Sequence, residues 1–146
     1  MPELERDDPV WVDAILDWKW TWLIARTAMV GPFVVSGVMK LLDFAEAKSE
    51  MEAFALHPNA FWAGLTIAVQ LVSSVLIIAG RFVWLGAGAL AVFTAITAFL
   101  AYAFWTMQGE ARFMAMNSFL EHFALIGGLI MTALIAEHAK RERRYW

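Results

Sequence analysis

Residues 59–80 read NAFWAGLTIAVQLVSSVLIIAG and contain no charged side chain, and a second uncharged stretch follows from Phe82 to Gln108. At a rise of about 1.5 Å per residue, a helix made from either stretch would cross the roughly 30 Å hydrocarbon layer of a bilayer. Because only Arg81 separates the stretches, the turn between them must be tight and the two helices antiparallel neighbours. The sequence therefore predicts an integral membrane protein.

The composition supports this class. Hydrophobic residues make up 61% of the 146 residues, and the charged 17% are concentrated in the segments 2–19, 40–52 and 137–144. The chain has no cysteine, which excludes thiol-disulfide chemistry and thiolate metal sites. A net charge of −3 does not indicate a nucleic-acid partner. The acidic start lacks the basic region of a cleaved signal peptide, so we expect the first apolar segment to be retained.

The pattern of apolar stretches predicts an all-α protein, an antiparallel bundle of four membrane-spanning helices. We expect a segment over residues 1–19 that contains an interfacial amphipathic helix, a short outer helix within residues 43–56, and a basic tail over residues 137–146. The four-helix domain covers residues 20–136, with spans at about 20–42, 59–80, 83–107 and 119–136.

Local signals predict where the helices begin and which way they cross. Asn59 is the expected N-cap of the second span, residues 108–117 form a polar connection, and Ser118 and Glu121 form a capping box for the fourth span. An even number of crossings places both termini on one side. That side carries the larger number of basic residues, so we expect both termini in the cytoplasm and the protein in the bacterial cytoplasmic (inner) membrane.

Two basic residues interrupt the first span. Arg26 and Lys40 are fourteen residues apart, which places them within roughly 40° of the same helix face, with Val30, Phe33 and Gly37 between them. One interpretation is that both side chains extend to the membrane surfaces and fix the topology. The alternative is that they line the bundle interior and hold a lipid headgroup, a quinone carbonyl or an anion.

Gln70 lies near the middle of the second span, with Ser73 and Ser74 on the same side. Polar groups at this depth need partners, and hydrogen bonds between helices are the simplest explanation. The expected partners are in the third span: Thr94, Thr97 and Tyr102.

The fourth span carries a ridge of small residues at intervals of four: Ala124, Gly128, Thr132 and Ala136. Such a ridge favours close helix packing. At the outer end of this span, Glu121 and His122 are interpreted as a cap and an interfacial aromatic, with a proton relay as the alternative. His57 is predicted on the same side of the membrane. No metal site and no covalently bound cofactor is expected.

Several short motifs in this order resemble the DoxX family of small bacterial membrane proteins. The resemblance covers about residues 24–132 and rests on these segments: Ala25-Arg26, Ser36 to Phe44, Ile78 to Arg81, Phe104-Trp105 and Ala124 to Leu129. The chain departs from the family where relatives commonly have Glu and Gly-Gly in the second span and His before the Phe-Trp pair. It has Gln70, Ser73-Ser74 and Tyr102 there.

The resemblance implies four transmembrane helices and an association with quinone-linked redox partners. Our leading hypothesis is a non-enzymatic accessory or anchoring subunit, with a quinone-sized or lipid-sized cleft formed by Arg26, Lys40, Gln70 and Tyr102. A second hypothesis is a quinone-dependent oxidoreductase component whose protons pass through Tyr102, His122 and Glu121. A third is a small transporter acting as an oligomer. Membrane lipids, a redox enzyme subunit or a second copy of the chain are the expected partners.

Overall fold

The computed structural model describes residues 9–142, and this part of the chain is helical with no β-strand. The elements are α1 (Val10–Leu16), α2 (Thr21–Leu42), α3 (Phe44–Ala53), α4 (Asn59–Ala79), α5 (Val83–Ala101), the 3-10 turn η1 (Phe104–Thr106) and α6 (Gly109–Glu142). Four of the described helices, α2, α4, α5 and α6, are long and apolar enough to cross a membrane. This confirms the predicted all-α fold with four membrane-spanning helices. The cytoplasmic location of the termini stays a prediction.

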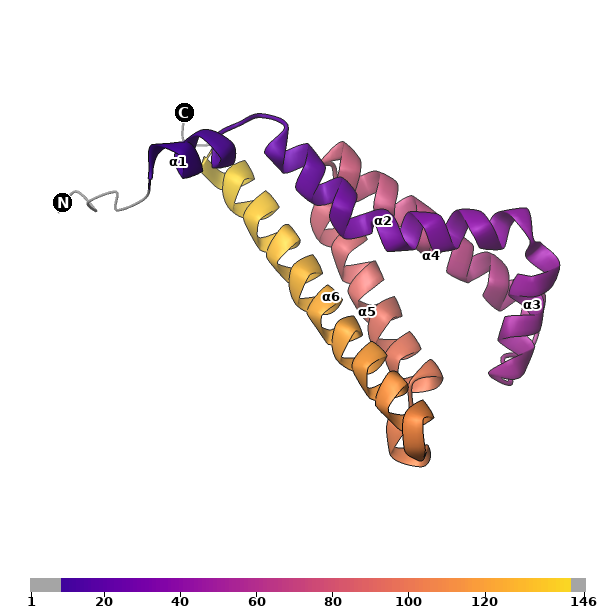
Figure 1. The fold of residues 1–146 in the computed structure, drawn as a ribbon. Helices are drawn as coiled ribbons and strands as arrows, with labels where there is room; N and C mark the ends of the chain where they lie inside the picture. Colours follow the sequence, from indigo (N-terminus) through magenta and orange to yellow (C-terminus); the bar gives the residue numbers. More distant parts are fainter. Residues whose placement is uncertain (1–8, 143–146) are drawn as a thin grey trace.

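The long helices form two antiparallel pairs. Helix α2 packs against α4, and α5 packs against α6. The pairs meet where α4 turns into α5 and diverge toward the opposite end, where α3 packs against α4 (Figure 1). The bundle is therefore closed at one end and open at the other.

The closed end depends on the tight turn between α4 and α5. Gly80 ends α4 with a φ of +69°, in the left-handed region that glycine enters at little cost, and Phe82 also has a positive φ, of 52°. The backbone N–H groups of Gly80 and Arg81 donate to carbonyls of the last turn of α4. This confirms the turn predicted between the second and third spans.

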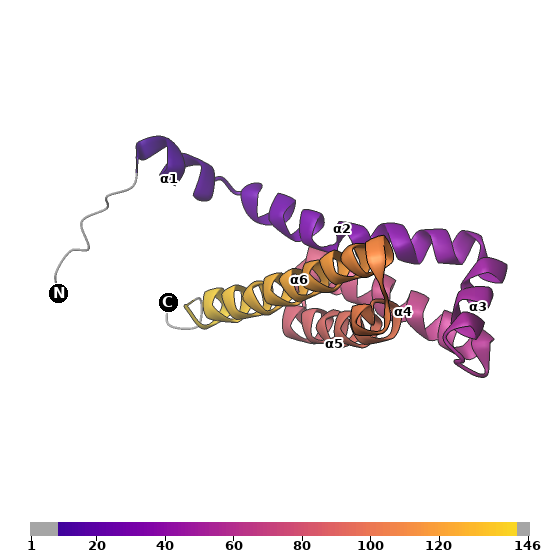
Figure 2. The same ribbon diagram turned by 60° about the horizontal axis from the view of Figure 1, so that its bottom comes forward.

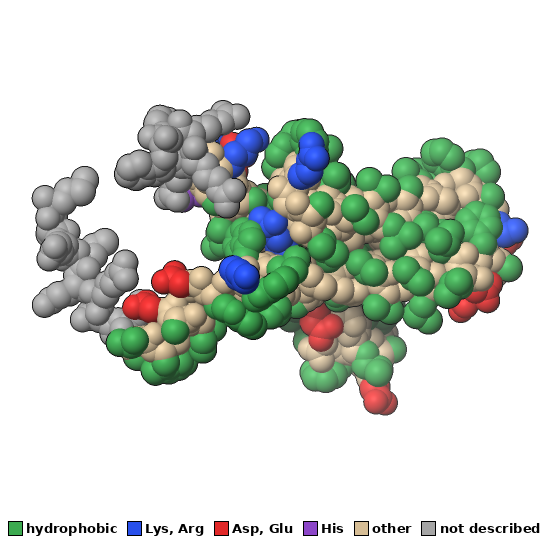
Figure 3. All heavy atoms as spheres, turned by 90° about the horizontal axis from the view of Figure 1, so that it is seen from above, with side chains coloured by type: hydrophobic (Ala, Val, Ile, Leu, Met, Phe, Trp, Pro, Cys, Tyr) green, Lys and Arg blue, Asp and Glu red, His purple; other side chains and the backbone are tan. Residues whose placement is uncertain are grey.

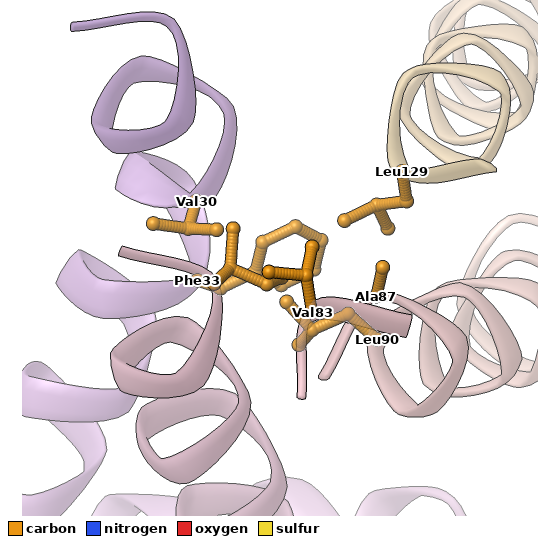
Figure 4. Packing of buried hydrophobic residues seen from close by; sticks show 7 residues of the cluster. Val30, Phe33, Val83, Ala87, Leu90 and Leu129 are labelled. Atoms are coloured by element: carbon orange, nitrogen blue, oxygen red, sulfur yellow. The ribbon is translucent and has the colours of Figure 1, made fainter. Parts of the chain in front are cut away.

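A buried apolar cluster holds the two pairs together. Figure 4 shows Val30 and Phe33 from α2 packing toward Val83, Ala87 and Leu90 of α5 and Leu129 of α6, and Ile77 of α4 completes the cluster. Gly86 brings α5 against the backbone of α4, since a Cβ at Gly86 would lie 2.8 Å from the carbonyl oxygen of Ser73. The core therefore requires a residue without a side chain at position 86.

The small-residue ridge of the fourth span brings α6 close to α2 at one position. A Cβ at Gly128 would lie 2.8 Å from the sulfur of Met29, and the hydroxyl of Thr132 donates to the Gly128 carbonyl within α6. Ala136 packs on the apolar core from the same helix. The predicted close approach is therefore present at Gly128.

Two predicted helix starts are wrong. Helix α6 begins at Gly109 rather than at about 119, because residues 110–117 include good helix formers such as Ala111 and Ala115. Ser118 and Glu121 thus lie inside a helix and form no capping box. Asn59 is the first residue of α4 and makes no cap hydrogen bond, and the N-cap is Pro58. The third span, predicted at about 83–107, corresponds to Val83–Thr106, in which α5 ends at Ala101 and η1 follows.

The ends of the chain complete the arrangement. In Figure 2, α1 extends beyond the helix pairs, and none of its residues is buried. Its predicted place on the membrane surface is untested, and the acidic start and the last basic residues lie outside the described range.

In the view of Figure 3, hydrophobic side chains cover much of the surface, and most of the visible Lys and Arg side chains lie toward the end of the molecule that carries α1. Lipid would cover such an apolar surface.

Candidate functional site

A cavity of about 970 Å³ lies between the two diverging helix pairs. We call it the central cavity. It is lined by residues of α2, α3, α4, α5 and α6 and by Tyr102, and apolar side chains such as Phe33, Val69, Val92 and Leu125 make up most of the lining. This volume is in the upper part of the range for small-molecule sites, which are typically about 300–1,000 Å³. The divergence of the pairs, seen in Figure 1, leaves room for an apolar molecule of that size.

An ion pair borders the central cavity where α2 meets α3. The ammonium of Lys40 donates to the carboxylate of Glu50, and both residues line the cavity. Asp43 positions α3 for this contact, because its side chain caps the helix by accepting from the backbone N–H of Glu46 at 3.0 Å. The Lys40 side chain is only 18% exposed and that of Glu50 is 42% exposed. The pair therefore neutralises the one lysine charge at the cavity.

Gln70 lies on the α4 wall of the cavity and is 4% exposed. Its Nε2 donates to Oγ of Ser36 on α2 at 3.1 Å, whereas its Oε1 is buried and has no hydrogen-bond partner within residues 9–142. A buried polar atom without a partner costs about 1–3 kcal/mol. This unpaired oxygen is buried within the packing of α4 and is not exposed to the cavity.

The predicted partners of Gln70 in the third span are wrong. Thr94 donates to the carbonyl of Leu90 in its own helix at 2.6 Å, and neither Thr97 nor Tyr102 is bonded to Gln70, although all three residues line the cavity. The reason is the packing of α4, which turns the face that carries Gln70 toward α2. Sequence reasoning missed Ser36 because hydroxyl groups occur on every span and often bond within their own helix.

Tyr102 and His122 form a ring contact at the cavity. Their ring centroids are 4.8 Å apart, and Nδ1 of His122 lies 2.7 Å from the carbonyl oxygen of Ser118, one turn earlier in α6. Glu121 is exposed and is not part of the cavity lining, and His57 is exposed too. The structure thus brings together two of the three residues of the predicted relay. No group of three His, Asp or Glu residues in the described chain could hold a metal ion.

Arg26 lies away from the central cavity. Its guanidinium is 4.5 Å from the centre of a Trp22 ring, and its Nη1 would be 2.5 Å from a Cβ added at Gly80. It therefore lies beside the C-terminal end of α4, where the helix dipole favours a positive charge. The predicted cleft shared by Arg26 and Lys40 is wrong, because fourteen residues of helix separate their Cα atoms by about 21 Å and the two ends of α2 have different neighbours.

The comparison with known protein families agrees with this architecture. The family model for DoxX matches residues 21–103, which is more than half of the chain and extends from the start of α2 to just beyond Tyr102. The chain belongs to the DoxX family. The matched range includes Lys40, Glu50, Ser36 and Gln70 and excludes α6.

This DoxX protein also resembles a curated bacterial protein. It is 25% identical over 112 residues to the inner membrane protein YphA of Escherichia coli strain K12, an alignment that covers 77% of this chain and 80% of the relative. No solved structure matches this DoxX protein significantly. The comparisons therefore establish a DoxX membrane protein and name no ligand.

Proposed function

We propose that this DoxX protein is a non-enzymatic accessory subunit of a quinone-linked redox system in the bacterial inner membrane, and that its central cavity holds a molecule the size of a quinone or lipid. The inner-membrane location of the relative YphA and the apolar surface of the four long helices support the location. The redox link comes from the family resemblance. The cavity supports the binding role.

The central cavity itself, about 970 Å³ in volume and lined mostly by apolar side chains from both helix pairs, is the observation that carries the proposal. Pockets that bind small molecules are mostly apolar, with a few polar groups that orient the ligand. The central cavity has this character, because a few separate polar side chains interrupt its apolar lining: Lys40 paired with Glu50, Gln70 bonded to Ser36, and Tyr102 beside His122. An amphipathic molecule would place its polar group near these side chains and fill the apolar space.

The proposal is tested by extracting the bound molecules. The protein is purified from its native membrane in mild detergent, and quinones and lipids are quantified by mass spectrometry against the protein concentration. We expect a roughly stoichiometric quinone or lipid, together with a redox enzyme in the same complex. The proposal fails if the chain is recovered with neither.

A pair of tryptophan substitutions localises the bound molecule. Ala89→Trp narrows the central cavity, because Ala89 lines it. Ala68→Trp adds the same side chain on the exposed surface of α4, outside the lining. Occupancy should fall in the first variant and persist in the second. Equal occupancy in the two variants would place the molecule outside the cavity.

The contact between Tyr102 and His122 favours one alternative, a quinone-dependent oxidoreductase component. The two rings line the cavity side by side and provide a phenol and an imidazole that can exchange a proton with a bound quinone. The predicted route through Glu121 lacks support, because that carboxylate is exposed away from the cavity lining. Quinone reduction that is abolished by Tyr102→Phe and His122→Ala, and retained in Glu121→Gln, would favour this alternative.

A further inference from the structure

The ionisable side chains of the central cavity are distributed unevenly along the helix axes. Within residues 9–142, those that line the cavity are Lys40, Glu50, Tyr102 and His122. Lys40 and Glu50 meet where α2 joins α3, at the open end of the helix pairs. Tyr102 follows the last residue of α5 at the same end and lies beside His122. One helix pair therefore contributes an ion pair, and the other a phenol and an imidazole, to the open end of the cavity.

Helix α5 borders the cavity along most of its length and shows where the lining becomes apolar. Its lining residues nearest the closed end carry no charge and, apart from one indole N–H, no polar side-chain atom: Trp84, Leu85, Gly88 and Ala89. The lining runs on to Ala101, and sixteen residues of helix from Leu85 correspond to about 24 Å. Because the hydrocarbon layer is roughly 30 Å thick, an apolar tail in the cavity can extend past the middle of the bilayer.

The closed end of the bundle is sealed by packed side chains. Ile77 of α4 is fully buried there and Val83 of α5 is 5% exposed, and both belong to the apolar cluster of Figure 4. A polar head group would have to cross this packing to enter from the closed end, and burying such a group without partners is costly. The helix pairs diverge at the open end (Figure 1), where the lining includes the exposed side chains of Ile96 and Leu100.

Resting on the proposed function, we propose that the central cavity takes up an amphipathic molecule in one orientation and from one leaflet, the leaflet at the open end. The polar group of the ligand lies between the Lys40–Glu50 pair and the rings of Tyr102 and His122, and its tail extends along α5 toward Ala89. With the termini in the cytoplasm, as the basic residues predict, this is the periplasmic leaflet. A quinone and a single-tailed lipid share this chemistry.

Photolabelling of the wild-type chain in nanodiscs tests the orientation without any substitution. Two forms of a hexadecyl quinone are compared, one with a diazirine beside the ring and one with a diazirine at the end of the tail. Labelled residues are identified by mass spectrometry. Within α5 and the residue that follows it, we expect the ring probe to label residues 97–102 and the tail probe to label residues 84–89. These labels should disappear when excess unlabelled quinone is present.

The lipid-facing surface of α4 provides the internal control. Phe61 and Val75 lie toward opposite ends of α4, are 59% and 64% exposed, and are outside the cavity lining. Amphipathic molecules dissolved in the two leaflets have their head groups at both membrane surfaces. The ring probe should therefore label the surroundings of both residues, although it labels only one end of the cavity.

Two tryptophan substitutions in the lining give a second, independent measurement. Ala89 and Ala101 are alanines of α5 that line opposite ends of the cavity. Tyr102 and Ala89 are about 20 Å apart along α5, which a hexadecyl tail can span and a decyl tail cannot. Ala89→Trp should therefore weaken binding of the hexadecyl quinone by about fivefold or more through overpacking and affect the decyl quinone less. Ala101→Trp should weaken both quinones alike.

The source of the ligand is identified by competition. Excess hexadecyl quinone and excess monopalmitoylglycerol are each added before irradiation. Displacement of the cavity labels by the quinone alone would support both the orientation and the quinone link. Displacement by the monoacylglycerol alone, with head and tail at the expected ends, would support the orientation and overturn the quinone link.

The remaining outcomes separate this inference from the proposed function. Ring labels at residues 84–89, or ring labels spread equally over both ends of the cavity, would overturn the orientation and leave the proposed function intact, because the cavity would still be occupied. A larger loss for the hexadecyl quinone in Ala101→Trp than in Ala89→Trp would overturn it in the same way. The absence of any displaceable label in the lining would overturn both.

Discussion

The ammonium of Lys40 on α2 is paired with the carboxylate of Glu50 on α3, across the short connection between the two helices. This contact fixes α3 at the open end of the helix pairs, where both side chains border the central cavity. It also explains how a lysine is accommodated near the end of an apolar span. A buried charge is tolerated when it is paired, and here the partner comes from the next helix along the chain.

The two partners of this ion pair should respond unequally to substitution. Glu50→Gln leaves the 82%-covered side chain of Lys40 without its counter-charge, whereas Lys40→Met leaves a carboxylate that is 42% exposed and can be hydrated. We expect Glu50→Gln to reduce the unfolding free energy by about 1–3 kcal/mol and Lys40→Met by less than about 1 kcal/mol. Thermal unfolding in mild detergent measures both. Equal losses would show that Lys40 does not depend on Glu50.

Gly86 should tolerate no side chain. A Cβ at this position would meet the backbone oxygen of Ser73 at 2.8 Å, and a backbone atom of a packed helix cannot move aside cheaply. Gly86→Ala should therefore destabilise the protein by about 1–3 kcal/mol through overpacking between α4 and α5. Gly127→Ala is the control, because nothing lies within 4 Å of its added Cβ, and it should be neutral or stabilising by up to about 1 kcal/mol. A neutral Gly86→Ala would contradict the helix packing described above.

Gln70→Met should stabilise the ligand-free protein. The substitution removes an unpartnered buried oxygen, which costs about 1–3 kcal/mol, and it loses one hydrogen bond to Ser36 worth about 0.5–1.5 kcal/mol. The net gain is about 1 kcal/mol. The unfolding midpoint of protein stripped of lipid, compared with that of wild type treated in the same way, measures this effect. A lower midpoint for the variant would mean that Oε1 already has a partner.

The absence of cysteine from the chain allows a clean test of topology. The turn at Arg81 lies at the closed end of the bundle, and Arg112 lies near the start of α6 at the opposite end of the molecule. Because basic residues favour the cytoplasmic side, we expect an impermeant maleimide to label Arg112→Cys in intact spheroplasts and to label Arg81→Cys only after permeabilisation. The reverse pattern would place both termini outside the cytoplasm.

The helices could be predicted from the sequence because their signal is local. Long apolar stretches and the glycine at position 80 determine the four spans and the turn at Gly80, whatever the helices pack against. The length of α6 was not predictable in this way. Residues 109–117 are polar enough to suggest a connection, and only the structure shows that the helix continues through them.

The site was less predictable than the fold. Helical periodicity shows which side chains share one face of a helix, but it does not show which residues of the other helices they contact. Lys40, Gln70 and Tyr102 all line the central cavity, but Arg26 on the same face of α2 lies beside Gly80 instead. Glu50 was missed because a charge in a polar segment is usually solvated. A basic residue at the end of a span, followed by an acidic helix, is the signal that could have identified the pair.

Photochemical labelling tests the central claim, occupation of the cavity between the helix pairs by an amphipathic molecule, most directly. The protein in native membranes is irradiated with an azido-quinone that has been reduced to its quinol, and the labelled peptides are identified by mass spectrometry. We predict labels on the cavity segments of α2, α4 and α5, at residues 32–40, 62–70 and 85–102, and loss of these labels when excess decylubiquinol is present. Labels confined to the exposed surface of α6, such as residues 130–135, and unaffected by the competitor would contradict the claim.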